Sequence, residues 1–122
     1  MVDEVRSFLV ERAEAAVAAG VEEVWIDPGI GFGKTVEHNL ELLARLDELV
    51  ATGFPVLLGT SRKRFLGALL AGADGRDGLV ATDDRIEGSL ATAIWGYGAG
   101  ARMVRAHDVA ATVAAAEAVA GL

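Results

Sequence analysis

Three short stretches of the sequence combine residues that can bind and react with a small polar ligand. They are DPGIGFGKT at 27–35, GTSRK at 59–63 and RAHD at 105–108. Each follows an apolar run that is typical of a buried strand. Because functional groups in parallel α/β folds gather at the carboxyl ends of the strands, we expect all three stretches to lie on one rim. That rim would present a carboxylate, a hydroxyl, several cations and an imidazole.

The stretch at 27–35 ends like a phosphate-binding loop but does not satisfy the pattern of one. Its tail, Gly33-Lys34-Thr35, fits G-x-x-x-x-G-K-[ST], which then requires a glycine where the chain has Pro28. Proline has no N–H group and cannot adopt a positive φ, so it cannot cradle a phosphate. The glycines at 29, 31 and 33 also have the wrong spacing for the dinucleotide-binding pattern G-x-G-x-x-G. Both nucleotide-binding interpretations are therefore excluded.

An acid at a strand end, followed by an aromatic residue on a glycine-rich loop, favours a flat and nitrogen-rich ligand. The carboxylate of Asp27 can accept two N–H donors from a guanidine-like edge. Phe32, on the flexible loop, can close over a flat ring. The competing interpretation is structural: Asp27 caps the turn, Phe32 fills the core and Lys34 is solvated. For this stretch we favour the functional interpretation.

The stretch at 59–63 contains hydroxyl groups and cations at a predicted helix start. Thr60 and Ser61 can act as ordinary helix caps. Lys63 lies one turn past a buried strand, so its ammonium group can reach inward to a ring oxygen or nitrogen. Arg62 and Arg64 are expected to face outward as surface cations.

His107 follows Arg105 by two residues, a spacing that places both side chains on the same side of an extended segment. Together they offer two donors to an anionic group. Alone, His107 would be an ordinary packed or exposed histidine. Metal ligation by this chain is not expected, because the other histidine, His38, falls at the start of a surface helix.

The remaining residues form the elements that must position these groups. Apolar spacing predicts helices over 3–19, 36–51, 62–72, 85–97 and 108–120, and strands over 23–27, 54–59 and 101–106. A polar, glycine-bearing loop is predicted over 72–84. Asp3 and Asp108 are expected to cap the first and last helices, and Trp25 and Trp95 to be packing residues. Strands separated by helices indicate parallel strands with helical crossovers in one α/β domain, residues 1–122.

Composition excludes several classes of protein. The 122 residues are 52% hydrophobic and carry a formal net charge of −7, which opposes binding to nucleic-acid phosphates. No cysteine is present, which excludes disulfides, thiolate metal sites and cysteine nucleophiles. No apolar run reaches the roughly 20 residues that a membrane span needs, and the acidic N-terminus resembles neither a signal nor a transit peptide. We expect a cytoplasmic protein without nucleic-acid or membrane partners.

Taken in order, the motifs resemble those of dihydropteroate synthase. DPGIGFGK, Asn39 with Leu42-Leu43, GTSRK, EGSLATA and RAHDV match the order and spacing of that family's C-terminal portion, over essentially the whole chain. The resemblance implies a TIM (β/α)8 barrel, of which this chain supplies the last three strands and their helices. It also implies a reaction in folate biosynthesis: 6-hydroxymethyl-7,8-dihydropterin pyrophosphate condenses with p-aminobenzoate to give 7,8-dihydropteroate and pyrophosphate.

The resemblance also assigns roles to residues at the three strand ends. It implies pterin binding by Asp27, Phe32, Gly59, Lys63 and Arg105, p-aminobenzoate binding by Phe32, Ser61 and Lys63, and pyrophosphate binding by Arg105 and His107. Asp27 and Lys63 would be the catalytic residues. Mg²⁺ would assist the pyrophosphate from an asparagine near the first strand, outside this chain, and the full-length family implies a homodimer. One departure is Ala106, where the family usually has valine.

Two alternatives stay open beside the synthase. A barrel of this class has about 250 residues, so the 122 residues alone are expected to be inactive. They could instead form a non-catalytic module that binds a pterin or a phosphate. A pterin-dependent methyltransferase barrel is the other alternative. Lys63 and the Arg105–His107 pair favour the synthase, because a methyl transfer has no pyrophosphate to hold.

Overall fold

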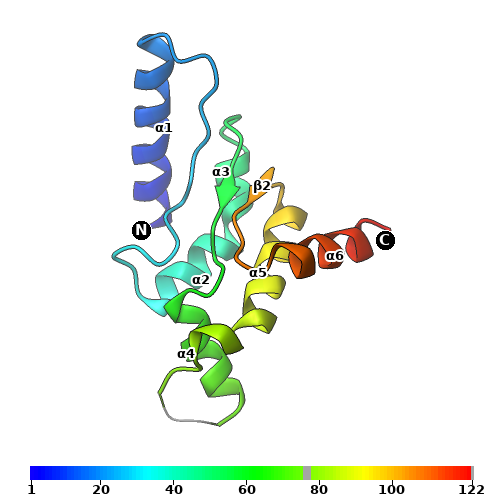
Figure 1. Ribbon diagram of the computed structural model, residues 1–122. Coiled ribbons are helices and arrows are strands. Elements are labelled where there is room, and N and C mark those ends of the chain that lie inside the picture. The colour runs from blue at the N-terminus through cyan, green and yellow to red at the C-terminus, as the bar shows by residue number, and fades with distance from the viewer. Residues whose placement is uncertain (76–77, 122) are drawn as a thin grey trace.

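The computed structural model describes residues 1–75 and 78–121 and follows the predicted alternation of helices and strands (Figure 1). Its elements are α1 (Val2–Ala18), α2 (Val36–Ala44), α3 (Leu46–Val50), β1 (Leu57–Leu58), α4 (Arg64–Ala73), the short 3-10 helix η1 (Thr82–Asp84), α5 (Ile86–Ala99), β2 (Met103–Val104) and α6 (Val109–Ala120). Part of the predicted loop 72–84 lies outside the described residues. Of the rest, the first two residues belong to α4 and the last three to η1.

Three chain segments run parallel at the centre of the molecule, as the sequence predicts. β1 pairs with β2 in the register Leu57↔Met103 and Leu58↔Val104. The segment before the glycine loop joins β1 through one parallel bridge, Ile26↔Val56. The predicted strand 23–27 is thus reduced to a bridge, and the strands 54–59 and 101–106 shorten to two residues each.

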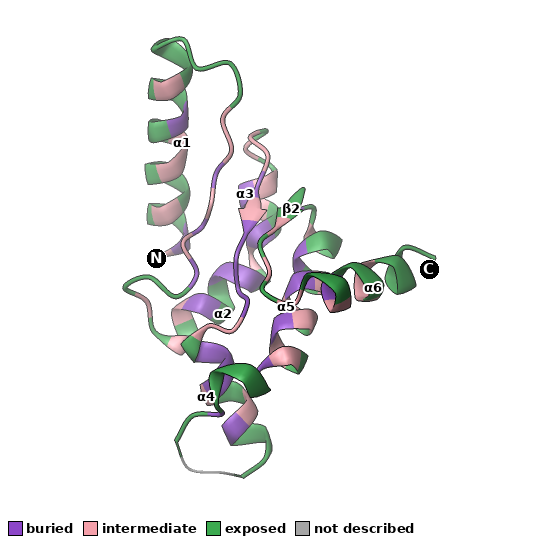
Figure 2. Ribbon diagram, viewed as in Figure 1, coloured by how far each residue is buried: buried purple, intermediate pink, exposed green. Residues whose placement is uncertain are grey.

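The hydrophobic core lies between this small sheet and the helices that follow it. Ile26, Val56 and Leu58 from the parallel segments pack with residues of α2, α3 and α4. Figure 2 shows buried residues along the central segments and on the inner sides of α2, α4 and α5, while α1 and α6 are largely exposed. The core therefore fixes the three parallel segments relative to one another, and so fixes the residues at their ends.

The predicted helix 36–51 is divided at Arg45, which has φ −108° and ψ 22°. The guanidinium group of Arg45 pairs with Glu41, Glu48 and Asp3, the last at 2.8 Å from α1. On the two resulting helices Leu42, Leu43, Leu46 and Leu49 are buried, whereas Leu40 is exposed.

Helix α1 stands beside the body and contacts it mainly through α2 (Figure 1). Asp3 does not cap it: the cap position is Met1, without a side-chain hydrogen bond, and Asp3 pairs with Arg45 instead. On this helix Phe8 and Val17 are exposed, whereas Val2 and Ala13 are buried. Across the part of the chain that the structure describes, neither α1 nor any other helix has the length and apolarity needed to cross a membrane.

The two tryptophans are less deeply packed than predicted. Trp95 on α5 is 55% exposed, although its indole N–H donates to the Leu43 carbonyl at 2.6 Å. Trp25 is half-buried, and its indole N–H donates to the Glu23 carboxylate at 2.8 Å. A hollow of about 690 Å³ beside Trp95 is lined mainly by small and apolar residues of α2, α3, α5 and α6. It lacks convergent polar groups, so it is not the candidate site.

Candidate functional site

The parallel pairing brings the three predicted stretches to one end of the sheet. Asp27 follows the bridged residue Ile26, Gly59 follows the last residue of β1, and Arg105 follows the last residue of β2. The Arg105 N–H donates to the Leu58 carbonyl at 2.9 Å, which fixes the start of the third stretch against the second. The expected common rim is therefore present.

A cavity of about 310 Å³ lies on this rim. Its lining residues are Gly59, Ser61, Lys63, Arg105, Ala106 and His107. Asp27 is not among them. It lines a second hollow of about 330 Å³ between the glycine loop and α1, and its Oδ2 lies 3.8 Å from Nη1 of Arg105. The cavity thus brings together the predicted site residues Gly59, Ser61, Lys63, Arg105 and His107, and Asp27 adjoins this group through Arg105.

Asp27 combines a structural contact with a free acceptor. Its Oδ1 accepts the Gly29 N–H at 2.8 Å, so the residue does cap the turn. The other oxygen lies 3.8 Å from the Arg105 guanidinium, beyond hydrogen-bond distance, so it can still accept an N–H donor of a ligand. The structural and the functional interpretations of Asp27 are therefore compatible.

The glycine loop is held by contacts that the sequence did not reveal. The Lys34 ammonium donates to the carbonyls of Gly29, at 2.8 Å, and Phe32, at 3.0 Å, so the interpretation of Lys34 as a solvated side chain is wrong. Asn39, only 2% exposed, accepts the Gly31 N–H at 2.9 Å. Gly31 has φ +87°, which a residue with a side chain rarely adopts. These contacts fold the loop back toward the strand ends.

Phe32 does not fill the core, as the structural interpretation held, but is 69% exposed at the tip of the loop. The Lys63 ammonium lies 4.8 Å from the centre of its ring, within the range of a cation–π contact. An aromatic ring beside a cation at a cavity edge can stack on a flat ligand. The geometry is consistent with the predicted position of Phe32 over the site.

Lys63 reaches inward, as predicted, from the cap position of α4. Its ammonium donates to the Ile30 carbonyl, and its stem packs against Gly31, where an added Cβ would lie 3.0 Å from Cδ. Partial burial lowers the pKa of Lys63. The Asp27 carboxylate opposes that shift, and the Arg105 guanidinium adds to it. Lys63 is therefore a cation with weakened hydration, able to exchange its carbonyl partner for a ligand acceptor.

Gly59 makes room for Arg105. A Cβ at Gly59 would lie 2.5 Å from Nη2 of Arg105 and 3.0 Å from its Cζ. The guanidinium group consequently lies across the end of β1, between Asp27 and the cavity, with its side chain 59% exposed. Its donors remain accessible to an anion.

Ser61 and His107, which both line the cavity, form a close pair. The Ser61 hydroxyl oxygen lies 2.8 Å from Nδ1 of His107 and accepts the main-chain N–H of His107 at 3.0 Å. Ser61 thereby orients the imidazole ring on the same rim as Arg105. Two donors of the kind that bind phosphate oxygens stand together, as the i, i+2 spacing predicts.

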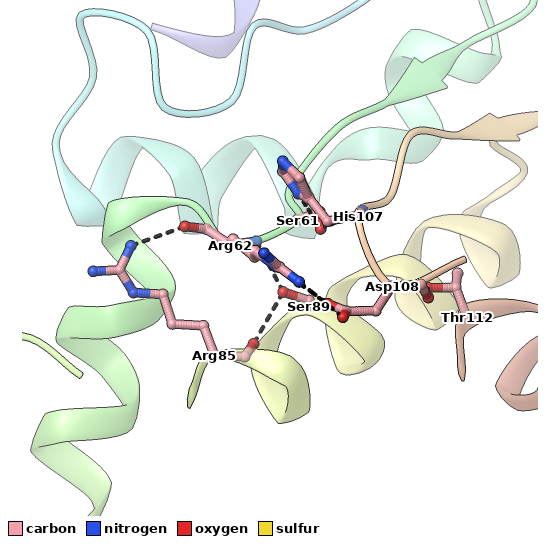
Figure 3. A network of polar contacts seen from close by, with 7 residues as sticks. All are labelled: Ser61, Arg62, Arg85, Ser89, His107, Asp108 and Thr112. Carbon is pink, nitrogen blue, oxygen red and sulfur yellow. Dashed lines mark hydrogen bonds and ion pairs between the residues drawn. The ribbon is translucent and has the colours of Figure 1, made fainter. Parts of the chain in front are cut away.

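Two expectations about charged residues near the site are wrong. Arg62 does not face outward: its guanidinium pairs with Asp108, Nη2 to Oδ1 at 3.0 Å (Figure 3). Asp108 occupies the cap position of α6 but makes no capping hydrogen bond, because its carboxylate is engaged by Arg62, which lowers the pKa of Asp108. Arg64 is exposed, as predicted.

Comparison with known proteins finds a matching family and similar chains. The family described as "Pterin binding enzyme" matches residues 1–107. The dihydropteroate synthase of Mycobacterium leprae is 50% identical over 121 residues, which are 98% of this chain and 42% of that protein. The crystal structure of dihydropteroate synthase from Thermus thermophilus has a TM-score of 0.90 and 45% identity, covering 99% of this chain and 46% of that one.

A third similar protein is the Xanthomonas albilineans dihydropteroate synthase in complex with 7,8-dihydropteroate. It has a TM-score of 0.89 and 44% identity, covering 98% of this chain and 44% of that one. The chain therefore spans less than half the length of the relatives it matches. The prediction of a partial TIM barrel is confirmed by these structural matches. On the matched residues and the shared fold, the chain belongs to the family of pterin binding enzymes.

Proposed function

We propose that the chain supplies the C-terminal part of a dihydropteroate synthase active site. In that site, 6-hydroxymethyl-7,8-dihydropterin pyrophosphate and p-aminobenzoate would condense to 7,8-dihydropteroate, with release of pyrophosphate. The observation that carries the proposal is the meeting of Asp27, Lys63 and Arg105 at the ends of three parallel segments. The similar synthases support it, among them one whose structure contains 7,8-dihydropteroate.

The proposed roles follow from the chemistry of each side chain. The free oxygen of Asp27 accepts N–H donors from the amino-pyrimidine edge of the pterin, and Lys63 donates to a ring oxygen or nitrogen. Phe32, beside Lys63, stacks on the flat ligands. Gly59 leaves space for the Arg105 guanidinium next to the pterin. Ser61, together with Phe32 and Lys63, borders the p-aminobenzoate.

The reaction breaks the C–O bond to pyrophosphate and forms a C–N bond to the amine of p-aminobenzoate. Positive charge develops on the carbon attached to the pterin as the leaving group departs. Asp27 at the strand end stabilises that charge, and Arg105 with His107 stabilises the growing negative charge on the leaving oxygens. The amine is nucleophilic without a strong base and loses its proton after attack. The site therefore needs fixed charges more than it needs a catalytic triad.

Mg²⁺ belongs to the proposal only for the longer enzyme. Within residues 1–75 and 78–121, no three histidine or acidic side chains converge to bind a metal ion. The resemblance places the magnesium ligand on the first strand, outside this chain. We therefore assign no step to a metal through the residues at hand. When bound in the complete site, the ion would neutralise pyrophosphate charge.

The 122 residues contain only part of the proposed pocket, so we expect no synthase activity from them alone. The exposed apolar residues of α5 and α6, Trp95 and Val113 among them, are consistent with a homodimer of the longer protein. A cytoplasmic location is part of the same proposal. The non-catalytic module and the methyltransferase are the competing proposals, and the Arg105–His107 pair, suited to pyrophosphate, speaks against the methyltransferase.

A hybrid synthase tests the proposal. In the hybrid, these 122 residues replace the matching segment of the Mycobacterium leprae enzyme, which is 50% identical to them. We expect the hybrid to restore growth of a bacterial strain that lacks its own dihydropteroate synthase, and the Arg105→Met hybrid to fail. The isolated chain is expected to fail as well. A well-folded hybrid that forms no dihydropteroate would contradict the proposal and favour the alternatives.

A further inference from the structure

The turn between β1 and α4 contains a main-chain conformation that its sequence does not explain. Arg62 has φ +58°, and no other non-glycine residue in the described ranges has a positive φ. For a residue with a Cβ, the left-handed conformation costs roughly 1–2 kcal/mol. Such a conformation persists only where surrounding contacts hold it. The flanking residues, Ser61 and Lys63, both line the site cavity.

Three contacts from outside the turn hold Arg62 (Figure 3). Its N–H donates to the Ser89 hydroxyl at 2.9 Å, and its carbonyl accepts from Nη1 of Arg85 at 2.8 Å. Its guanidinium group pairs with Asp108 at 3.0 Å. Because the first two contacts fix both main-chain polar groups of Arg62, they determine how its two peptide planes are turned.

Arg85 is built into the fold for this contact. It is a charged residue with only 9% exposure, and its Nε donates to the Val80 carbonyl at 2.8 Å. The Ser89 hydroxyl, which accepts the Arg62 N–H, donates in turn to the Arg85 carbonyl at 2.9 Å. Gly67 on α4 provides the space: a Cβ there would lie 2.6 Å from Nε of Arg85.

We propose that Arg85 is a positioning residue for the synthase site. It holds the left-handed turn at Arg62 and, through it, directs the Ser61 hydroxyl to His107 and the Lys63 ammonium into the cavity. The proposal rests on the proposed function for its consequence, which is weaker binding of pyrophosphate when Arg85 is lost. Its structural part, the Ser61–His107 contact, can be measured without any substrate.

The experiment uses the 122-residue chain and three variants: Arg85→Met, Arg85→Lys and the matched control Arg64→Met, which removes an exposed arginine from the same region. Nitrogen-15 NMR of the His107 ring reports the hydrogen bond at Nδ1, thermal melting reports the fold, and titration with inorganic pyrophosphate reports binding. We expect Arg85→Met to abolish the hydrogen-bonded Nδ1 signal and to weaken pyrophosphate binding about tenfold, which corresponds to one charge-assisted contact. Arg85→Lys, which keeps a donor, retains most of both, and Arg64→Met equals the wild type.

A fourth variant, Gly67→Ala, tests the role of Arg85 if Arg85→Met does not fold. Gly67→Ala places a methyl group against the Arg85 guanidinium while improving the helix propensity of α4, so the fold is retained and the guanidinium is displaced. Unchanged His107 signals in the folded Gly67→Ala chain, and in the Arg85→Met chain where it folds, would overturn the proposal. If the wild type itself binds no pyrophosphate, the proposed function loses support, whereas the His107 signals still decide the role of Arg85.

Discussion

Gly59→Ala separates binding from stability more sharply than any other substitution in the site. The new Cβ would lie 2.5 Å from Nη2 of Arg105, whereas ordinary contact begins near 3.4 Å. The Arg105 guanidinium must therefore withdraw by about 0.9 Å, the difference between those two distances. Its side chain is 59% exposed and free to move, so the strain is relieved by displacement of the charge rather than by unfolding.

The size of the effect follows from the contact that is lost. A hydrogen bond to a charged group contributes about 1.5–3 kcal/mol, which corresponds to a roughly 10- to 150-fold weaker affinity for pyrophosphate at about 1.4 kcal/mol per factor of ten. The backbone of Gly59 does not have a positive φ, so alanine fits it without strain. Because alanine gives the unfolded chain less conformational freedom than glycine, we expect the free energy of unfolding of Gly59→Ala to be unchanged or higher by up to about 1 kcal/mol.

The assay is the inhibition constant of pyrophosphate in the hybrid synthase, measured beside the melting temperature of the 122-residue chain. Gly98→Ala is the matched control, because a Cβ on Gly98 meets nothing within 4 Å. We expect the control to keep the wild-type inhibition constant. A Gly59→Ala hybrid that binds pyrophosphate as tightly as the wild type would show that Gly59 does not position Arg105.

The remaining predictions concern charge and loop order. Burial lowers the pKa of Lys63, and the Asp27 carboxylate opposes that shift. Carbon-13 NMR of methylated Lys63 is therefore expected to show titration below the ordinary lysine pKa of about 10.4. Asp27→Asn should lower the pKa further, and an increase would contradict the assignment. Asn39→Leu removes the acceptor of the Gly31 N–H, so hydrogen exchange in the glycine loop is expected to accelerate. Leaving that donor unpaired costs about 1–3 kcal/mol, which sets the size of the acceleration. Unchanged exchange would show that Asn39 does not order the loop. The ion pair with Arg62 lowers the pKa of Asp108, so its stabilisation is present above the ordinary aspartate pKa and is lost as the pH falls through the lowered value. The urea midpoint of the wild type should therefore fall toward that of Asp108→Asn under acid, and a constant difference between them would refute the linkage.

The convergence of the site could be predicted from sequence because it follows from topology. Parallel strands joined by helices put their carboxyl ends on one edge, so polar residues after each apolar run had to meet. Asp27, Lys63 and Arg105 needed no further information to be placed together. The i, i+2 spacing likewise predicted that Arg105 and His107 share a rim.

The remaining features depend on contacts between residues far apart in the chain. Neither the residue type of Arg62 nor its neighbours in the sequence indicate a left-handed conformation. Its partners Ser89 and Asp108 follow 27 and 46 residues later. The pairing of Arg45 with Asp3 also spans a long separation, 42 residues. Local spacing predicted one continuous helix around Arg45 and indicated neither that pairing nor the division of the helix.

One available signal was the polar residue at position 39. Asn39 lies among leucines in a predicted amphipathic helix, and the structure shows it buried against the glycine loop. A buried amide in such a position has to find a hydrogen-bond partner, and a loop with three alternating glycines offers unpaired main-chain N–H groups. The contact between Asn39 and the glycine loop could therefore have been predicted from the sequence.

The most direct test of the central claim is a crystal structure of the hybrid synthase with 6-hydroxymethyl-7,8-dihydropterin pyrophosphate bound. We expect the amino-pyrimidine edge on the Asp27 carboxylate, the Lys63 ammonium on the ring, and the phosphate oxygens on Arg105 and His107. A ligand bound away from these residues, or side chains of Asp27, Lys63 and Arg105 that point apart around it, would show that these three residues do not form the pterin site.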